Sequence, residues 1–343
     1  MRHTFRSTPM LVAALMLAGC DRQAQRSASP AVSDPVSTKT AADGVTAEGK
    51  TTDRTGRIVI NPRFDEAGPF SEGLAAVRIG AKYGYIDRSG KAVIAPQFDF
   101  AGSFSEGLAP VSIGSRYGYI DKQGKFAVNL QFDVANLFSF SEGLAPVRIG
   151  EYLTGKWGYI DRSGKVAIEP QFDSVGSFAD GLAVVAIDGK WGYIDKQGKF
   201  VVSPRFTSAG SFSDGLASVR IGDLFTGKDG YIDRQGKLAI APQFDAAFPF
   251  REGLADVRLG AEYGFIDKQG KIAIEPEFSF ADTFSDGLAA VVGDAATGKY
   301  GYIDKQGQIV IEPKFDFADK FSDGLAAVRI GDDKTGKYGY IGR

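Results

Sequence analysis

The sequence predicts an all-β protein made of eight copies of one short repeat, most simply a closed β-propeller-like ring. A Gly-aromatic-Ile string recurs eight times at spacings of 34 to 40 residues. An acidic-Gly-Leu-Ala string also recurs eight times. The composition, with 44 Gly, 26 Phe and 13 Tyr, suits short strands joined by tight turns. Self-similarity at such a period is typical of repeat architectures, and here it fills residues 51–343.

Each copy divides into three or four antiparallel strands. In the first complete copy, "LAAVRI" (74–79) predicts one strand and "YGYID" (83–87) predicts the next. The "DRSGK" that follows places a Gly three residues after an Asp, as in a type I turn closed by a left-handed residue. "KAVIAP" (91–96) predicts a third strand that stops at its Pro, because proline cannot donate to a ladder. "QFDFAGSF" (97–104) returns the chain through a short fourth strand.

The third strand predicts how the copies pack. Its second and fourth residues are almost always large and apolar, which indicates a core-facing side. Its third residue is only ever Ala or Val, so we expect the opposite side to be apolar and closely approached by a neighbouring sheet. A single copy cannot bury both sides, and the copies are therefore expected to stack on one another.

Two arrangements of the eight copies fit these counts. The first copy lacks its opening strands and begins near residue 53, while the last ends on "YGYIGR" (338–343). Strands from the two ends would complete one unit together, which closes a propeller and removes its edge strands. An open β-solenoid of hairpins with frayed ends is the alternative. We favour the closed ring.

The N-terminal residues 1–20 have the parts of a secretory signal peptide. Arg2 and Arg6 precede a short apolar run that is too short to span a bilayer. The run ends in "LAGC", which resembles the bacterial lipobox and makes Cys20 the predicted lipidation site. Asp21 slightly favours the inner over the outer membrane. Residues 21–50 have no Phe, Tyr, Trp, Leu or Ile and predict a disordered tether.

Composition excludes several kinds of chemistry. His3 and Cys20 are the only His and Cys of the chain, so the repeats cannot supply a Ser-His or Cys-His catalytic site, a His or Cys metal site, or a disulfide. The formal net charge is −2 and the cations are scattered, which argues against a nucleic-acid partner. Carboxylates recur equally in every copy, so no pair is singled out for a glycoside hydrolase. We therefore expect no enzyme activity and no metal or cofactor.

The string "GKWGYIDKQGK" (189–199), with "FSEGLA"-type and "IEPQFD"-type strings on either side, resembles the bacterial WG (or KWG) repeat family. The resemblance covers the chain from residue 53 to the end. The Trp-Gly pair itself survives only at Trp157 and Trp191, while Tyr replaces Trp in five copies and Asp229 in one. The resemblance implies a secreted or envelope-associated β-repeat domain, and it implies no catalytic activity or defined ligand.

Two sets of recurring acids are candidate sites. The Asp of "GYID" could bind Ca²⁺ or carbohydrate, but an Asp that opens a turn explains it more simply. The acids before Gly-Leu-Ala could form an anionic rim; we expect them instead to face solvent or to pair with Arg on the following strand, where Arg78, Arg148, Arg220, Arg258 and Arg329 stand six residues later. These acids are Glu72, Glu106, Glu142, Asp180, Asp214, Glu252, Asp286 and Asp323.

Departures from the repeat are the better candidates for function. Four copies carry an extra Thr-Gly-Lys segment between the first two strands, and two of these segments have apolar tips. The predicted binding surface comprises Tyr152, Leu153, Trp157, Trp191, Leu224 and Phe225. The expected function is a non-catalytic, lipid-anchored protein of the bacterial cell envelope that faces the periplasm and binds other proteins. Binding of peptidoglycan or another glycan through exposed aromatics is the alternative, and a glycan hydrolase comes third.

Overall fold

The computed structural model describes residues 56–132, 139–150 and 154–343, and these residues form β-strands, turns and loops without a helix. They belong to a compact unit, Asp53–Arg343. The innermost strand of a sheet has two residues, as in β2 (Glu66–Ala67), β6 (Phe100–Ala101), β13 (Ser174–Val175), β17 (Ser208–Ala209), β21 (Ala246–Ala247), β25 (Phe280–Ala281) and β29 (Phe317–Ala318). The second strand is β3 (Leu74–Ile79), β7 (Leu108–Ile113), β10 (Leu144–Ile149), β14 (Ala183–Ile187), β18 (Ala217–Ile221), β22 (Ala255–Leu259), β26 (Ala289–Val292) or β30 (Leu325–Ile330).

The outer half of each sheet is formed by the Gly-aromatic-Ile strand and the strand after it. The third strand is β4 (Lys82–Asp87), β8 (Arg116–Asp121), β11 (Lys156–Asp161), β15 (Lys190–Ile194), β19 (Lys228–Ile232), β23 (Glu262–Ile266), β27 (Tyr300–Ile303) or β31 (Lys337–Gly342). The outermost strand is β5 (Ala92–Phe98), β9 (Phe126–Phe132), β12 (Val166–Phe172), β16 (Phe200–Phe206), β20 (Leu238–Phe244), β24 (Ile272–Phe278), β28 (Ile309–Phe315) or β1 (Ile58–Phe64).

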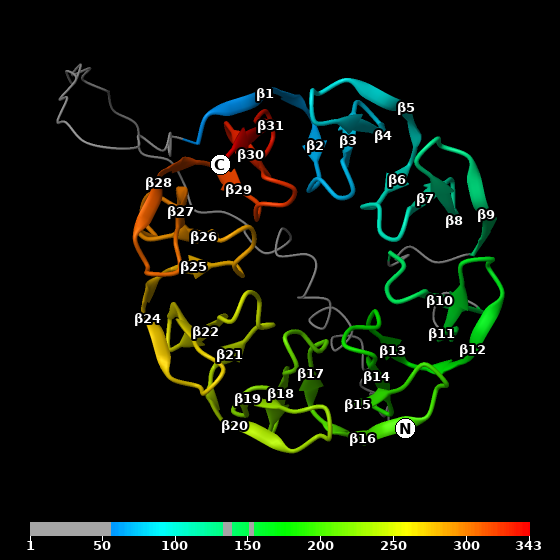
Figure 1. Cartoon of the computed structure of the whole chain (residues 1–343), viewed down its shortest axis with the longest axis vertical. Coiled ribbons are helices and arrows are strands. Elements are labelled where there is room, and N and C mark those ends of the chain that lie inside the picture. The colour runs from blue at the N-terminus through cyan, green and yellow to red at the C-terminus, as the bar shows by residue number, and fades with distance from the viewer. Residues whose placement is uncertain (1–55, 133–138, 151–153) are drawn as a thin grey trace, which may run out of the picture. The chain divides into compact units, whose positions relative to one another are not determined.

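The sheets are the eight blades of a closed β-propeller, as we predicted (Figure 1). We number them along the chain: blade 1 is β2–β5, blade 2 is β6–β9, blade 3 is β10–β12, and blades 4 to 7 follow in fours. Blade 8 combines β29, β30 and β31 from the C-terminal end with β1 from the N-terminal end. β1 pairs antiparallel with β31, and Phe64 lies opposite Tyr338. This pairing closes the ring and excludes the open solenoid.

The hydrophobic core lies between neighbouring blades rather than within one. Between blades 1 and 2, Tyr85 and Ile94 from one sheet pack against Phe104 and Val111 from the next. The hydroxyl of Tyr85 donates to the carbonyl oxygen of Gly102 at 2.8 Å, so the buried phenol is satisfied by the adjacent blade. Each blade therefore depends on the next for its core, as expected for stacked repeats.

The outermost strands differ from the sequence-based expectation. In β5 only Ile94 and Phe98 are buried, whereas Val93 is 48% exposed, and the strand continues through Pro96. The prediction of a closely packed second face on this strand was wrong, as was the predicted stop at proline. The physical reason is position: an outermost strand has no neighbour on one side, so proline costs it no ladder bond and most of its side chains face solvent.

The Gly of each Gly-aromatic-Ile string is required by a close approach inside its own sheet. A Cβ atom on Gly84 would lie 2.5 Å from the carbonyl oxygen of Ile94 and 2.7 Å from the nitrogen of Pro96. The pairing of β4 with β5 is irregular at this point, where Tyr85 pairs with Ile94 and Tyr83 with Phe98. Only glycine lets the bulged outer strand come so near.

The acidic-Gly-Leu-Ala strings form two-residue hairpin turns next to the propeller axis. Ser71 and Leu74 exchange backbone hydrogen bonds, and the two residues between them have positive φ angles, 52° at Glu72 and 86° at Gly73. This is the geometry of a type I′ turn, which favours Asn, Asp or Gly at the first position. Asp takes that position in four of the eight turns and Glu in the other four. We call the face of the propeller that carries these turns the turn face.

The acids of these turns connect all eight blades in a circle. The Glu72 carboxylate accepts a hydrogen bond from the backbone N–H of Gly107 in blade 2, at 3.1 Å, and the Asp323 carboxylate of blade 8 accepts one from Gly73 in blade 1, at 3.0 Å. The same bond forms from Gly143, Gly181, Gly215, Gly253, Gly287 and Gly324 to the acid of the preceding blade. We call these eight carboxylates the closure ring.

The cations that accompany the closure ring are not the ones we predicted. Glu72 is paired with Lys122 at 3.0 Å, and Lys122 belongs to the β8–β9 turn of the next blade. Arg78, the predicted partner, is paired with Glu66 instead. Six residues of extended strand span about 20 Å, so Arg78 lies at the opposite end of the blade from Glu72.

Candidate functional site

The face opposite the closure ring, which we call the loop face, carries the loops between the second and third strands. At five junctions a Lys at the start of the third strand bonds an Asp that follows the outermost strand of its own blade. The Nζ atom of Lys82 lies 2.6 Å from Asp99, and that of Lys228 lies 2.5 Å from Asp245. The other pairs are Lys156–Asp173, Lys299–Asp316 and Lys337–Asp65.

The junction between blades 4 and 5 keeps the cation of this pattern and loses the acid. Lys190 lies opposite Ile187 as Lys228 lies opposite Ile221, so it occupies the same register. Thr207 stands where the other junctions have Asp, and its hydroxyl donates to the carbonyl oxygen of Gly222 at 2.5 Å. Within the described residues, Lys190 makes no ion pair.

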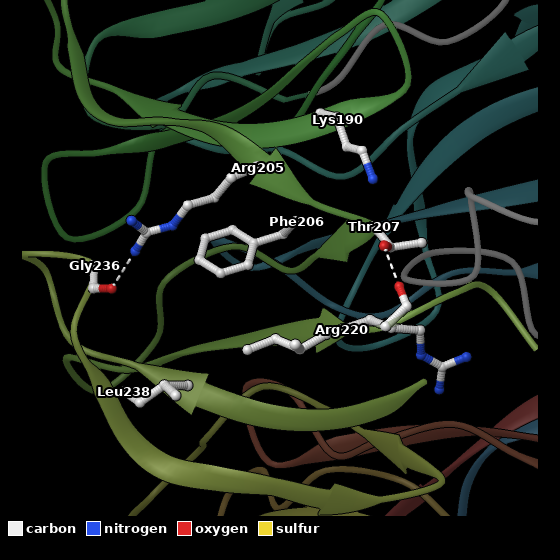
Figure 2. Close-up of a pocket in the computed structure, with 9 residues that line it drawn as sticks. Lys190, Arg205, Phe206, Thr207, Arg220, Gly236 and Leu238 are labelled. Carbon is white, nitrogen blue, oxygen red and sulfur yellow. Dashed lines mark hydrogen bonds between the residues drawn. The ribbon is translucent and has the colours of Figure 1, made fainter. Parts of the chain in front are cut away.

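A pocket of about 410 Å³ lies at this junction (Figure 2). Lys190, Thr207 and Phe206 line it from blade 4 and from the segment that follows β16, and the Lys190 amine points toward Thr207. Its remaining walls are Arg205, Arg220, Ile221, Gly222, Gly236 and Leu238.

The two arginines of the pocket are already engaged. Arg205 lies over the Phe206 ring, 4.9 Å from its centre, and donates to the carbonyl oxygen of Gly236 at 2.6 Å. The Arg220 guanidinium bonds Asp229 and the carbonyl oxygens of Leu224 and Asp245. Lys190 is therefore the cation of the pocket that is free to bind an added anion.

Next to the pocket, the loop 222–228 presents an exposed aromatic ring. Asp223 accepts hydrogen bonds from the backbone N–H groups of Phe225 and Thr226 at 2.8 and 2.7 Å, and from the Thr226 hydroxyl. These bonds hold the pKa of Asp223 down to about 2 and fix the loop. The Phe225 side chain at its tip is 91% exposed, more than any other large apolar side chain among the described residues.

Related loops in other blades have the same frame with different tips. Asp332 accepts from the N–H groups of Lys334 and Thr335, as Asp223 does from its own loop. The tip residues between the Asp and the Thr are Ala295 and Ala296 in blade 7 and Asp333 and Lys334 in blade 8. A constant frame with a variable tip is typical of a recognition loop on a rigid scaffold.

The residues predicted to form the binding surface differ in how far they are exposed. Trp191 is only 6% exposed, so it is part of the interior and cannot act as an exposed aromatic. Trp157 and Leu224 are half-buried, and Phe225 is exposed. Tyr152, Leu153 and the predicted lipidation site Cys20 lie outside the described residues. Lys190 and Thr207 were missed, although aligning "FT" at 206–207 with the "FD" of six other copies would have marked the lost acid.

The Asp of each "GYID" string is a turn residue, as predicted. The Asp87 carboxylate accepts hydrogen bonds from the N–H groups of Ser89 and Lys91 at 2.9 and 3.1 Å. Gly90 closes the turn with a φ angle of 82°. Among the described residues, no three His, Cys, Asp or Glu side chains gather as they would around a metal ion.

A further pair of acids near the axis was not singled out by the sequence. Asp282 and Asp319 replace the Gly that follows the innermost strand in several other blades. Burial raises the pKa of Asp319, the neighbouring Asp282 charge raises it further, and the N–H of Lys320 opposes both. Neither acid lines the pocket at blades 4 and 5, so the pair adds nothing to the site on the loop face.

Comparison with known proteins identifies the repeat and supports the fold. The model of a family described as WG containing repeat matches residues 53–83, 83–117, 117–152, 157–191, 191–225, 230–262, 263–292 and 300–341. No curated protein sequence shows a significant match. The solved structure of a eukaryotic initiation factor superposes with a TM-score of 0.54 at 10% identity, over 84% of this chain and 88% of that one.

Two bacterial structures are similar at lower scores. PorZ, a surface component of the type-IX secretion system of Porphyromonas gingivalis, matches with a TM-score of 0.43 and 10% identity over 83% of this chain and 44% of its own. The extracellular domain of BT4673 from B. thetaiotaomicron matches with a TM-score of 0.43 and 11% identity, over 74% of this chain and 41% of its own.

Proposed function

The chain belongs to the WG-containing repeat family, and from that premise we propose that it is a non-catalytic platform that binds a protein partner on its loop face at blades 4 and 5. The observation that carries this proposal is Phe225, whose ring is 91% exposed on a loop held by Asp223. A large aromatic side chain is costly to leave in water, and aromatic anchors next to a pocket are typical of protein interfaces. Ile221 and Leu238, both exposed, extend the apolar surface into the pocket.

The proposal also places the protein on a membrane of the bacterial envelope, facing the periplasm and anchored through lipid on Cys20. Support comes from the sequence of residues 1–20, with its basic start, short apolar run and terminal "LAGC". In the part of the chain that the structure describes, no helix is long and apolar enough to cross a membrane. Metabolic labelling with a palmitate analogue tests the anchor, and the label is expected to disappear in Cys20→Ala.

Site-specific photo-crosslinking in the producing cells tests the partner. A photoreactive phenylalanine analogue replaces Phe225, and in a matched control it replaces Ala296, which holds the same place in the loop of blade 7. We expect a protein adduct at 225 that is absent at 296. Leu224→Asp in the 225 variant is expected to reduce the adduct at least tenfold, because the added charge must be desolvated at the interface.

Equal adducts at both positions would contradict a specific surface at blades 4 and 5. The glycan alternative is tested with insoluble peptidoglycan and residues 21–343 of the chain. Retention that is lost in Phe225→Ala would show that the exposed ring serves a sugar polymer and would overturn the protein-binding proposal. Phe225→Ala is suited to this test because so exposed a side chain contributes little to stability.

A further inference from the structure

The pocket at blades 4 and 5 exists where one acid has been removed from a repeated ion pair. The Asp at the equivalent places serves two groups: Asp245 accepts from the N–H of Gly260 at 2.8 Å and pairs with Lys228. Thr207 keeps the backbone position, since its N–H bonds the carbonyl oxygen of Arg220 as that of Asp245 bonds Arg258. Only the carboxylate is missing, and the Lys190 amine still points toward its place (Figure 2).

The surroundings of Lys190 define what could replace that carboxylate. Arg205 bonds a carbonyl oxygen and keeps its positive charge, whereas the charge of Arg220 is compensated by the Asp229 carboxylate. Thr207 adds no charge, and Phe206, Ile221 and Leu238 give the walls an apolar character. At the junction of blades 6 and 7 both residues of the pair differ, with Glu262 in place of Lys and Ser279 in place of Asp. That junction therefore has no Lys at the position equivalent to Lys190.

An isolated contact between an exposed Lys and an anion is weak, because water and salt screen it. A ligand that bound only the amine would therefore be held poorly. A carboxylate with a large apolar group beside it would gain more, since the apolar group can cover Ile221 and Leu238 while the carboxylate meets Lys190. Asp or Glu next to Leu, Ile or Phe has this shape in a bent segment of chain, because neighbouring side chains of an extended strand point to opposite faces.

From these observations we infer that the pocket binds an acidic side chain of the partner protein, flanked by an apolar residue, in the place of the lost Asp carboxylate. This inference rests on the proposed function and specifies its recognition chemistry. Phe225 supplies the apolar anchor beside the pocket, and Lys190 selects partners that carry an acid at the matching distance. We favour a carboxylate over a phosphate as the ligand, because the lysines equivalent to Lys190 at five other junctions each pair with a carboxylate.

The test uses isotope-labelled residues 21–343, which retain the whole compact unit, and the probe acetyl-Leu-Asp-Leu-amide. NMR titration is expected to shift the signals of Lys190, Thr207 and Gly222 with saturation in the millimolar range. The neutral peptide acetyl-Leu-Asn-Leu-amide is expected to bind at least tenfold more weakly. Inorganic phosphate forms a third arm of the titration and is expected not to saturate the same signals.

Three variants test the site without threatening the fold. Thr207→Asp restores the acid found at the other junctions and is expected to weaken binding of the acidic peptide at least tenfold by pairing with Lys190. Lys190→Ala is expected to do the same, whereas Lys190→Arg retains binding. Lys82→Ala, at a junction where Asp99 is present, is the matched control and leaves binding unchanged.

Equal binding of the acidic and neutral peptides, or unchanged binding in Thr207→Asp, would overturn the inference, as would saturation by phosphate alone. The photo-crosslink at residue 225 separates this failure from failure of the proposed function. A protein adduct that persists in Thr207→Asp, with no peptide binding in the wild type, would keep the platform and discard the acid-binding pocket.

Discussion

The two faces of this propeller use the same repeat in opposite ways. On the turn face, all eight copies place a carboxylate at the same point, and every one accepts a hydrogen bond from the next blade. On the loop face, the Lys–Asp pair is kept at five junctions, lost in part at Lys190 and Thr207, and replaced at Glu262 and Ser279. Loop length and loop tips vary there as well.

This difference separates the residues that hold the ring together from those free to specialise. A closed ring has no free end, so every junction between neighbouring blades contributes to holding it closed. A loop beyond the ends of the strands does not contribute to closing the ring, and the residues at its tip can change without destabilising the fold. If the two faces are separable in this way, changes to the ring lower stability, whereas changes to a loop tip alter binding alone.

Removing the strand that closes the ring should have the largest effect. A chain that begins at residue 66 lacks β1, and with it the buried side chains of Ile60 and Phe64. Burial of two such side chains is worth about 5 kcal/mol, and the exposed edge of β31 would favour association. We expect loss of monomer by size-exclusion chromatography and a much lower midpoint in urea. A chain that begins at residue 53 is the control, and it should have the same urea midpoint as the chain of residues 21–343.

A methyl group in the sheet interior should have the next largest effect. In Gly264→Ala the new Cβ would lie 2.6 Å from the carbonyl oxygen of Ile274, so the bulged outer strand must move. We expect a loss of about 2 kcal/mol in the free energy of unfolding, measured by urea denaturation. Gly293→Ala, on the loop face with no atom within 4 Å of the added Cβ, should change it by less than about 0.5 kcal/mol. Similar losses at both positions would show that the sheet interior is no more sensitive to an added methyl group than the loop face.

Acid should weaken the turn face before it affects the loop frame at Asp223. Partial burial raises the pKa of Glu142, but hydrogen bonds from Gly181 and Lys196 outweigh it and leave the pKa below its usual value of 4.5. A lowered folded-state pKa contributes stability above pH 4.5 that is lost as pH falls through the folded value. We expect the free energy of unfolding to fall below about pH 4.5, and Glu142→Gln to make that fall shallower. An unchanged pH profile in this variant would contradict a stabilising role for the closure ring.

Much of the fold followed from the sequence because its signals are local. The turn of Asp87 and Gly90 is specified within five residues, and eight equal copies with incomplete ends predict a closed ring. The partners of the closure ring were not predictable in the same way. Glu72 meets Gly107 and Lys122, which are 35 and 50 residues away, and only the stagger of adjacent blades brings them together.

The site was predicted in part for a related reason. Phe225 could be placed at a loop tip because an insertion interrupts the repeat there, and the structure leaves it exposed. Trp191 replaces a Tyr of the repeat, but whether such a ring is buried depends on side chains from elsewhere in the ring. The pocket at Lys190 arises because Thr207 replaces the Asp of the other pairs. This loss could be recognised only once the strand register showed that residue 207 faces Lys190.

The smallest expected effect is also the sharpest test of the comparison. Thr207→Asp makes the odd junction resemble the other five and should raise the free energy of unfolding by at most about 1 kcal/mol, because an exposed ion pair gains little. The gain should shrink in high salt and in a Lys190→Ala background, where only a hydrogen bond from the Gly222 N–H would remain, as a double-mutant cycle in urea would measure. If Thr207→Asp stabilises the protein and removes binding of the acidic peptide, then the fold tolerates an ion pair at this junction, and the natural sequence lacks it. The lost stability would then be the cost of an open site on the loop face, since nothing in the fold requires Thr at that position.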